Sequence, residues 1–302
     1  MAVSPGKKFA GFIGLSLIWG TTWLVIKIGL DGMPPFLGVG LRFIAAGTIV
    51  MTIGFIKDRK LAFSLSLFKL TLIIGILMFT ISYSAVYWAE QYISSGMASI
   101  MFSTLPFYVA AFAALILKNE RLNLLRVVGM IVGVLGTALI FSENLNVQNF
   151  IQLMALLAVF ISPISAAFAV VITKKNIHNY NRYLLNGGSM LVGGIATLSI
   201  HFIFESNMPL IWSTTSIGAL IYLTLIGSAL AFSIHFWMLL HVEATTVSFV
   251  TIVSPVVALF LGYIILSENL SGLQFAGSIF VIGGVLISEV LGVKTTNTST
   301  NS

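Results

Sequence analysis

The chain alternates between long apolar segments and short polar connections over almost its whole length. The apolar core of a bilayer is about 30 Å thick, so a helix needs roughly 20 apolar residues to cross it. Ten segments meet this length, with boundaries defined to within a few residues: 9–29, 36–56, 67–88, 94–117, 125–142, 148–172, 183–204, 213–236, 244–266 and 272–292. We therefore predict an all-α integral membrane protein with ten transmembrane helices.

The composition agrees with this prediction. Hydrophobic residues make up 58% of the 302 positions and charged residues only 8%, too few charges to cover a water-soluble surface. Cysteine is absent, which excludes disulfides, thiolate metal sites and cysteine nucleophiles. The net charge of +6 lies in short connections between apolar segments. We therefore expect the lipid bilayer, and not nucleic acid, as the partner of this charge.

Basic residues predict the orientation of the chain. If the ten segments alternate in direction, 13 of the 15 Lys and Arg residues fall on one side: Lys7, Lys8, Lys57, Arg59, Lys60, Lys69, Lys118, Arg121, Arg126, Lys174, Lys175, Arg182 and Lys294. Cytoplasmic loops retain Lys and Arg, so we predict cytoplasmic termini and a multi-pass protein of the plasma membrane. The polar tail 293–302 is predicted to be disordered.

An internal repeat relates the two halves of the sequence. When the third and fourth segments are aligned with the eighth and ninth, Trp88 matches Trp237 and Pro106 matches Pro255, both at an offset of 149 residues. The two predicted repeats contain five segments each and cover residues 9–142 and 148–292. Because five is odd, the second repeat enters the membrane from the opposite side, which predicts an inverted repeat with a pseudo-twofold axis in the membrane plane.

Helix-breaking residues mark positions near the middle of several segments. Pro106 and Pro255 occupy matching places in the fourth and ninth segments, Pro163 lies in the sixth and Gly20 in the first. Proline removes a backbone hydrogen bond and kinks its helix, and interruptions at matching positions point to a midplane substrate site. Membrane helices also tolerate proline for structural reasons, so that alternative stays open. We predict hinge or gating roles for these four residues.

The first segment carries a stripe of large side chains. Trp19, Trp23 and Lys27 are spaced at i, i+4 and i+8 and so share one helix face. Trp19 lies about ten residues into the segment, roughly 15 Å deep and near the midplane. We predict that Trp19 and Trp23 bind substrate, whereas headgroup anchoring is sufficient to explain Lys27.

Three further residues are candidates for substrate binding. Arg42 lies six residues into the second segment, about 9 Å deep, where its planar fork is suited to a carboxylate or phosphate, although Arg also snorkels from such depths. Tyr83 and Tyr87 lie near the outer end of the third segment, where they offer stacking surface or belong to an interfacial aromatic belt. We predict that Arg42, Tyr83 and Tyr87 join Trp19 and Trp23 in the substrate site.

Two degenerate motifs resemble a known family. The pattern WG-x-x-W-x-x-x-K at residues 19–27, the P-x(13)-E-R-L ending from Pro106 to Leu122 and its echo from Pro255 to Leu270 resemble the EamA repeats of the drug/metabolite transporter superfamily. The resemblance covers roughly residues 10–290. It implies a ten-helix secondary carrier that exports amino acids, other metabolites or toxic compounds. The sixth segment departs from the family by lacking the aromatic residue that many second repeats carry.

We therefore expect a secondary transporter that exports a small organic metabolite by alternating access, with an aromatic or amphipathic amino acid as the leading substrate. There is no G-x-x-x-x-G-K-[ST] phosphate loop, so ATP hydrolysis by that route is excluded. All nine acidic residues fall at or near segment ends. Facilitated flux, exchange, and coupling through Glu90 or the histidines stay open.

The remaining expectations concern other classes of protein. His201, His235 and His241 lack the H-E-x-x-H spacing, so we expect no metal site and no cofactor. No Ser-His pairing with motif context and no acid dyad lies within the segments, so we do not expect an enzyme. An intramembrane enzyme and a receptor or scaffold are the alternatives. The Gly129-x-x-x-Gly133 face is predicted to pack against another helix of the same chain. We expect the protein to be a monomer or a homodimer.

Overall fold

The computed structural model describes residues 3–58, 62–117, 123–142, 149–257 and 271–288, and these parts are helices joined by short connections. Six helical spans are long and apolar enough to cross a membrane: Pro5–Leu30, Pro35–Lys57, Leu65–Ala89, Phe150–Asn176, Arg182–Phe204 and Thr214–His241. Shorter apolar helices occupy the places of the other four predicted segments: Leu105–Ile116, Leu124–Leu139, Ala244–Val257 and Phe275–Leu286. The predicted all-helical membrane class is confirmed, whereas the count of ten transmembrane helices stays a prediction.

The helical elements have the following bounds: α1 Pro5–Leu30, α2 Pro35–Lys57, α3 Leu65–Ile74, η1 Gly75–Ser82, α4 Tyr83–Ala89, α5 Ser95–Phe102, α6 Leu105–Ile116, α7 Leu124–Phe141, α8 Phe150–Asn176, α9 Arg182–Phe204, α10 Thr214–Thr224, η3 Leu225–Leu230, α11 Ala231–His241, α12 Ala244–Ser248 and α14 Gly272–Leu286. The predicted tail lies outside the described residues.

Polar caps fix where several of these helices begin. A side-chain oxygen accepts the N–H of a residue in the first turn at the starts of α3, α7, α8, α9 and α10, the capping residues being Ser64, Asn123, Asn149, Asn181 and Ser213. Each cap satisfies one of the N–H groups that a helix leaves unpaired at its start. The starts of these five helices are therefore specified by a Ser or Asn residue in the local sequence.

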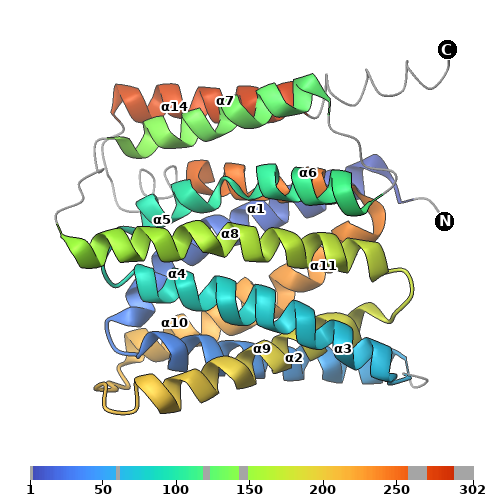
Figure 1. Cartoon of the computed structure of the whole chain (residues 1–302), viewed down its shortest axis with the longest axis vertical. Coiled ribbons are helices and arrows are strands. Elements are labelled where there is room, and N and C mark those ends of the chain that lie inside the picture. The colour runs from blue at the N-terminus through green and yellow to red at the C-terminus, as the bar shows by residue number, and fades with distance from the viewer. Residues whose placement is uncertain (1–2, 59–61, 118–122, 143–148, 258–270, 289–302) are drawn as a thin grey trace.

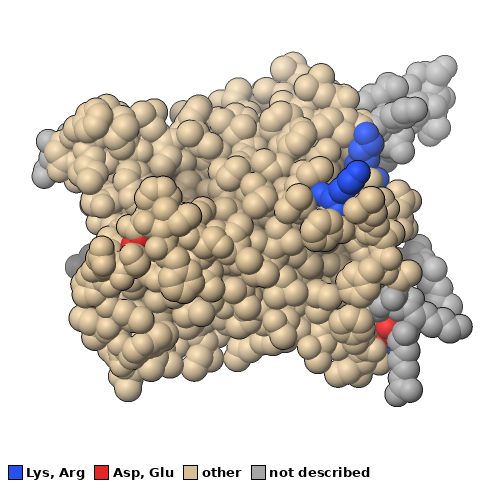
Figure 2. All heavy atoms as spheres, turned by 60° about the horizontal axis from the view of Figure 1, so that its bottom comes forward, with Lys and Arg blue, Asp and Glu red and all other residues tan. Residues whose placement is uncertain are grey.

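Two pairs of helices form opposite sides of the molecule. In Figure 1, α7 lies beside α14 at the top and α2 lies beside α9 at the bottom, with α1, α8 and α11 between them. On the face that Figure 2 shows, the visible Lys and Arg side chains gather at one end of the molecule. The helices therefore run roughly parallel to a line from this basic end to the opposite end.

Glycines allow the backbones of α7 and α14 to approach closely. A Cβ atom added to Gly284 would lie 2.5 Å from both the carbonyl oxygen of Gly129 and the backbone nitrogen of Gly133. No side chain fits at such a distance, so only glycine permits this approach. The prediction that the Gly129-x-x-x-Gly133 face packs within the chain is confirmed.

We expect Gly284→Ala to destabilise the protein by about 1–3 kcal/mol, the usual effect of forcing a methyl group into packed surroundings. Its neighbour Gly283 provides the matched control, because a Cβ atom there would meet nothing within 4 Å. Thermal unfolding of the two variants in detergent measures the difference. Equal unfolding temperatures for Gly284→Ala and Gly283→Ala would show that the two helices separate without cost.

The third and eighth spans both contain π-helical turns, which the sequence did not indicate. Gly75–Ser82 separates α3 from α4, and Leu225–Leu230 separates α10 from α11. The two stretches lie about one repeat offset apart. Wider turns of this kind leave backbone groups without their regular partners and occur frequently at functional sites.

The predicted hinge residues have four different settings. The fourth segment is broken between α5 and α6 by a turn at residues 103–104, and Pro106 is in the first turn of α6. Pro255 lies inside the helix that resumes after a turn at Phe249, whereas α8 continues through Pro163. Gly20 packs so closely on the ninth-segment helix that an added Cβ would lie 2.6 Å from Val257. Hinge roles for these residues stay predictions.

Candidate substrate-binding site

A cavity lies between the two outer helix pairs. Its lining comes from α1, η1, α4, α5, α6, α8, α11, α12 and the helix that follows α12. Among the described residues that line it, none belongs to α2, α9, α7 or α14. The cavity volume of about 70 Å³ is enough for several water molecules. Three spans of each predicted repeat therefore enclose one space.

Aromatic rings form much of the cavity wall. The ring centroid of Trp19 lies 5.5 Å from that of Phe232, and that of Trp23 lies 5.7 Å from that of Phe102. Tyr83 is also in the lining, with its ring centroid 6.0 Å from that of Phe232. These separations are typical of favourable aromatic pairs. The structure thus brings Trp19, Trp23 and Tyr83 to one cavity, as expected for a shared site.

Hydroxyl groups occupy other parts of the wall. Among the described residues, the serines and threonines that line the cavity are Thr22, Ser82, Ser248, Thr251 and Ser254. Thr22, Ser248 and Ser254 donate to backbone carbonyls of their own helices. Thr251 donates to the Ser248 carbonyl at the end of α12, and Ser82 is hydrogen-bonded to Ser162. Each hydroxyl oxygen still has lone pairs that accept hydrogen bonds.

Two nitrogen-containing rings in the wall lack, within the described part of the chain, the hydrogen bonds that these hydroxyls make. The Trp19 Nε1 atom is buried and has no hydrogen-bond partner among the described residues. His235 is only 3% exposed, and neither of its ring nitrogens has a partner there. The two rings are neighbours, with centroids 5.4 Å apart. Since buried polar groups are normally hydrogen-bonded, a ligand that reaches these two rings from the cavity would supply the partners that the described residues do not.

Arg42 does not line this cavity. Its guanidinium is fully buried and donates to Ser228 Oγ at 2.6 Å, to the Tyr87 hydroxyl at 3.0 Å and to the Gly227 carbonyl at 3.1 Å. Gly227 and Ser228 belong to the π-helical stretch η3. The guanidinium also lies 5.1 Å from the centroid of the Tyr83 ring, a cation–π distance. Arg42 and Tyr87 therefore lie outside the cavity lining, and Arg42 contacts the lining residue Tyr83. Their role in substrate binding stays a prediction.

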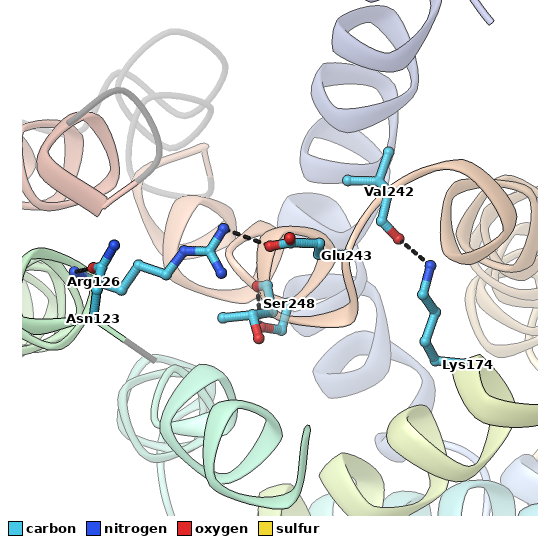
Figure 3. Close-up of polar contacts among 7 residues, drawn as sticks. Asn123, Arg126, Lys174, Val242, Glu243 and Ser248 are labelled. Atoms are coloured by element: carbon cyan, nitrogen blue, oxygen red, sulfur yellow. Dashed lines mark hydrogen bonds and ion pairs between the residues drawn. The ribbon is translucent and has the colours of Figure 1, made fainter. Parts of the chain in front are cut away.

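Two lysines make similar contacts at opposite ends of the molecule. Lys27, in the last turn of α1, donates to the backbone carbonyl of Glu90, which follows α4. Lys174, in the last turn of α8, donates to the carbonyls of Leu239 and Val242, both at 2.7 Å. Figure 3 shows the contact between Lys174 and Val242 next to the Arg126–Glu243 ion pair. Each lysine thus joins the end of one span to the end of another.

The carboxyl group of Glu90 is completely buried beyond the last residue of the third span. Neither carboxylate oxygen has a hydrogen-bond partner among the described residues. Burial raises the pKa of the Glu90 carboxyl well above its usual range, and the nearby Lys27 ammonium lowers it in part. The folded protein therefore favours the protonated, neutral form of Glu90.

This shift predicts how stability changes with pH. Because the pKa of Glu90 is higher in the folded than in the unfolded chain, its unfavourable contribution appears as pH rises above the unfolded value and disappears on acidification. Lowering the pH from about 8 to about 5 is therefore expected to stabilise the wild type relative to Glu90→Gln. Glu205, whose pKa burial also raises, contributes to both proteins alike. Identical pH profiles would contradict the burial of an ionisable Glu90.

Two cavity residues were missed by the sequence analysis, although the repeat contained the signal. Shifting Tyr83 by the repeat offset of 149 residues gives Phe232, and shifting Val86 gives His235. All four residues line the cavity. Applying the offset to the candidate Tyr83 would therefore have found Phe232, whereas His235 corresponds to Val86, which was not a candidate.

Family comparison gives the class of the protein. A family model described as the EamA-like transporter family matches residues 8–142 and again residues 153–289. The chain belongs to the EamA-like transporter family. It is therefore a multi-pass membrane transporter, and it sits in a lipid bilayer and binds a small-molecule substrate.

Relatives of this EamA-like transporter occur in bacteria and archaea. An uncharacterized transporter, YoaV of Bacillus subtilis, is 28% identical over 93% of this chain and 96% of its own. The uncharacterized inner membrane transporter YedA of Escherichia coli K12 is 28% identical over 93% of this chain and 90% of its own. A crystal structure covers 97% of this chain and 99% of its own with a TM-score of 0.79 at 18% identity, a likeness that shows the fold alone.

Proposed function

We propose that the protein is a secondary transporter that moves a small organic solute across the plasma membrane by alternating access, and that it exports this solute. The observation that carries the proposal is the pair of lysine contacts at opposite ends of the cavity-forming spans. Alternating access requires two ends that open in turn around one central site. Export as the direction follows from the family resemblance.

The two lysine contacts correspond under the predicted repeat. Leu239 lies 149 residues after Glu90, the offset that relates the third span to the eighth. Lys174 lies 147 residues after Lys27, and each lysine lies in the last turn of the first span of its repeat. The same contact is thus made once between spans one and three and once between spans six and eight. Two such contacts facing opposite ends are suited to alternate opening.

The arrangement of helices supports an inverted repeat. The outer pairs join equivalent helices of the two halves, the second with the seventh (α2 and α9) and the fifth with the tenth (α7 and α14). A twofold axis that relates the halves would pass between both pairs and through the cavity, perpendicular to the helices (Figure 1). The double match to the family model agrees with this division. An enzyme or a receptor does not require such symmetry.

Transport is tested by counterflow into liposomes that contain the purified protein. The panel of solutes comes from comparing extracellular metabolites of cells that overproduce the protein with those of cells that lack it. We expect saturable, protein-dependent counterflow of at least one metabolite that accumulates outside the overproducing cells. Absence of protein-dependent movement across the whole panel, with correctly folded protein in the liposomes, would overturn the proposal.

A further inference from the structure

The unpartnered groups in the cavity wall restrict the chemistry of its ligand. The Trp19 Nε1–H is a donor and requires an acceptor on the ligand. A neutral imidazole has one donor and one acceptor nitrogen, so His235 pairs with a ligand that offers either. Both groups are buried and neighbours on the cavity wall. A ligand edge that carries an acceptor beside a donor matches the two together.

The rest of the wall favours an uncharged, planar ligand. Among the described residues that line the cavity, none has a charged side chain at neutral pH if His235 is neutral. A free amino acid would bring two full charges into this space, and charges without partners are costly to bury. The rings of Trp19, Tyr83 and Phe232 instead offer surface for stacking or edge contact with another ring.

We propose that the cavity, in a conformation wider than the one with about 70 Å³, binds an uncharged heteroaromatic solute of the nucleobase type, with its ring against Trp19 and Phe232. Its acceptor takes the hydrogen bond of Trp19 Nε1, and His235 bonds to an adjacent donor or acceptor on the same edge. The hydroxyl oxygens of Ser248 and Thr251 accept from any further N–H group. This inference rests on the proposed transport function and names its substrate class.

The inference replaces the amino acid that the sequence suggested. That expectation required Arg42 as an anchor for a carboxylate. The guanidinium of Arg42 is instead bound to Ser228, Tyr87 and Gly227, and it lies outside the cavity lining. Without this cation in the wall, the site has hydrogen-bonding groups but no counter-ion for a carboxylate.

A pair of ligands of nearly equal shape tests the inference. Benzimidazole carries a ring N–H and a ring acceptor nitrogen, whereas indole has the N–H alone. We expect the full chain in lipid nanodiscs to bind benzimidazole about 2- to 12-fold more tightly than indole in calorimetry, the effect of one neutral hydrogen bond. Phenylalanine is expected to compete with benzimidazole only weakly. Equal affinities for benzimidazole and indole, or tight binding of phenylalanine, would overturn the inference.

Two substitutions assign the preference to the proposed residues. Trp19→Phe keeps an aromatic ring but removes the donor, so the preference for benzimidazole over indole should disappear. His235→Leu should weaken benzimidazole binding, and His235→Gln, which retains a donor and an acceptor, should restore part of it. The control is Trp212→Phe, because Trp212 is exposed and outside the cavity. An unchanged ligand preference in folded Trp19→Phe protein would exclude Trp19 Nε1 as the donor.

The same preparations separate this inference from the proposed function. One outcome is that the liposomes show counterflow of an amino acid and the protein in nanodiscs binds benzimidazole and indole equally. That outcome would support the transport function and overturn the proposed substrate class. Liposomes without any protein-dependent flux would overturn the transport function itself. If a variant fails to fold, the benzimidazole and indole comparison on the wild-type chain decides the question.

Discussion

Replacing Arg42 with glutamine is expected to lower the amount of folded protein in the membrane as well as its transport rate. The buried guanidinium donates to groups on the third and eighth spans, namely Tyr87, Ser228 and the Gly227 carbonyl. Glutamine is too short to reach all three, so buried polar atoms lose their partner, each at a cost of about 1–3 kcal/mol. Removing the buried charge offsets part of this loss, and we expect a net destabilisation of about 3 kcal/mol.

Membrane abundance and thermal unfolding in detergent measure this effect. Ser189→Ala is the matched control, since the approximate alignment of the repeats places Ser189 or a neighbour at the position of Arg42. Among the described residues, the Ser189 hydroxyl bonds within its own helix, to the Leu185 carbonyl at 2.7 Å. We expect nearly normal abundance for that variant. A folded, abundant and inactive Arg42→Gln protein would instead support the original hypothesis that the guanidinium binds substrate.

Arg42 shows where sequence reasoning reached its limit. The sequence places a cation within the second span but not the direction in which its side chain points. That direction depends on the π-helical stretch η3, which presents the Gly227 carbonyl to the guanidinium. Apolar composition does not distinguish a π-helical turn from an α-helical one. The depth of the residue was therefore predictable, and its partners were not.

Regular periodicity predicted that two of the candidate side chains lie together. Trp19 and Trp23 reach the same cavity because steps of four residues keep side chains on one helix face. The second repeat shows the same stripe as Ala166, Val170 and Lys174, in which the first two also line the cavity. The aromatic residues of the first stripe indicate a binding surface in the sequence. The aliphatic residues of the second stripe do not, because such residues are common throughout apolar spans.

Replacing the lysine that ends either stripe is expected to change which end of the molecule is open. Lys27→Met should loosen the end of the molecule where α1 meets α4, and Lys174→Met should loosen the opposite end, where α8 meets α11. Methionine retains much of the apolar stem, but it cannot donate to the Glu90 carbonyl or to the Leu239 and Val242 carbonyls. If the two contacts alternate during transport, removing one favours the conformation that is open at that end.

The absence of cysteine makes this shift measurable without background labelling. A single cysteine at Thr251, a cavity-lining position, reports access when an impermeant thiol reagent is added to one side of sealed vesicles. With the reagent at the Lys27 end, we expect Lys27→Met to be labelled faster than the parent and Lys174→Met to be labelled more slowly. With the reagent at the opposite end, we expect Lys174→Met to be labelled faster and Lys27→Met more slowly. A free-energy shift of about 1.4 kcal/mol would change the ratio of the two conformations tenfold. If both variants changed the labelling rate in the same direction at a given end, the two contacts would stabilise the fold in general and would not alternate during transport.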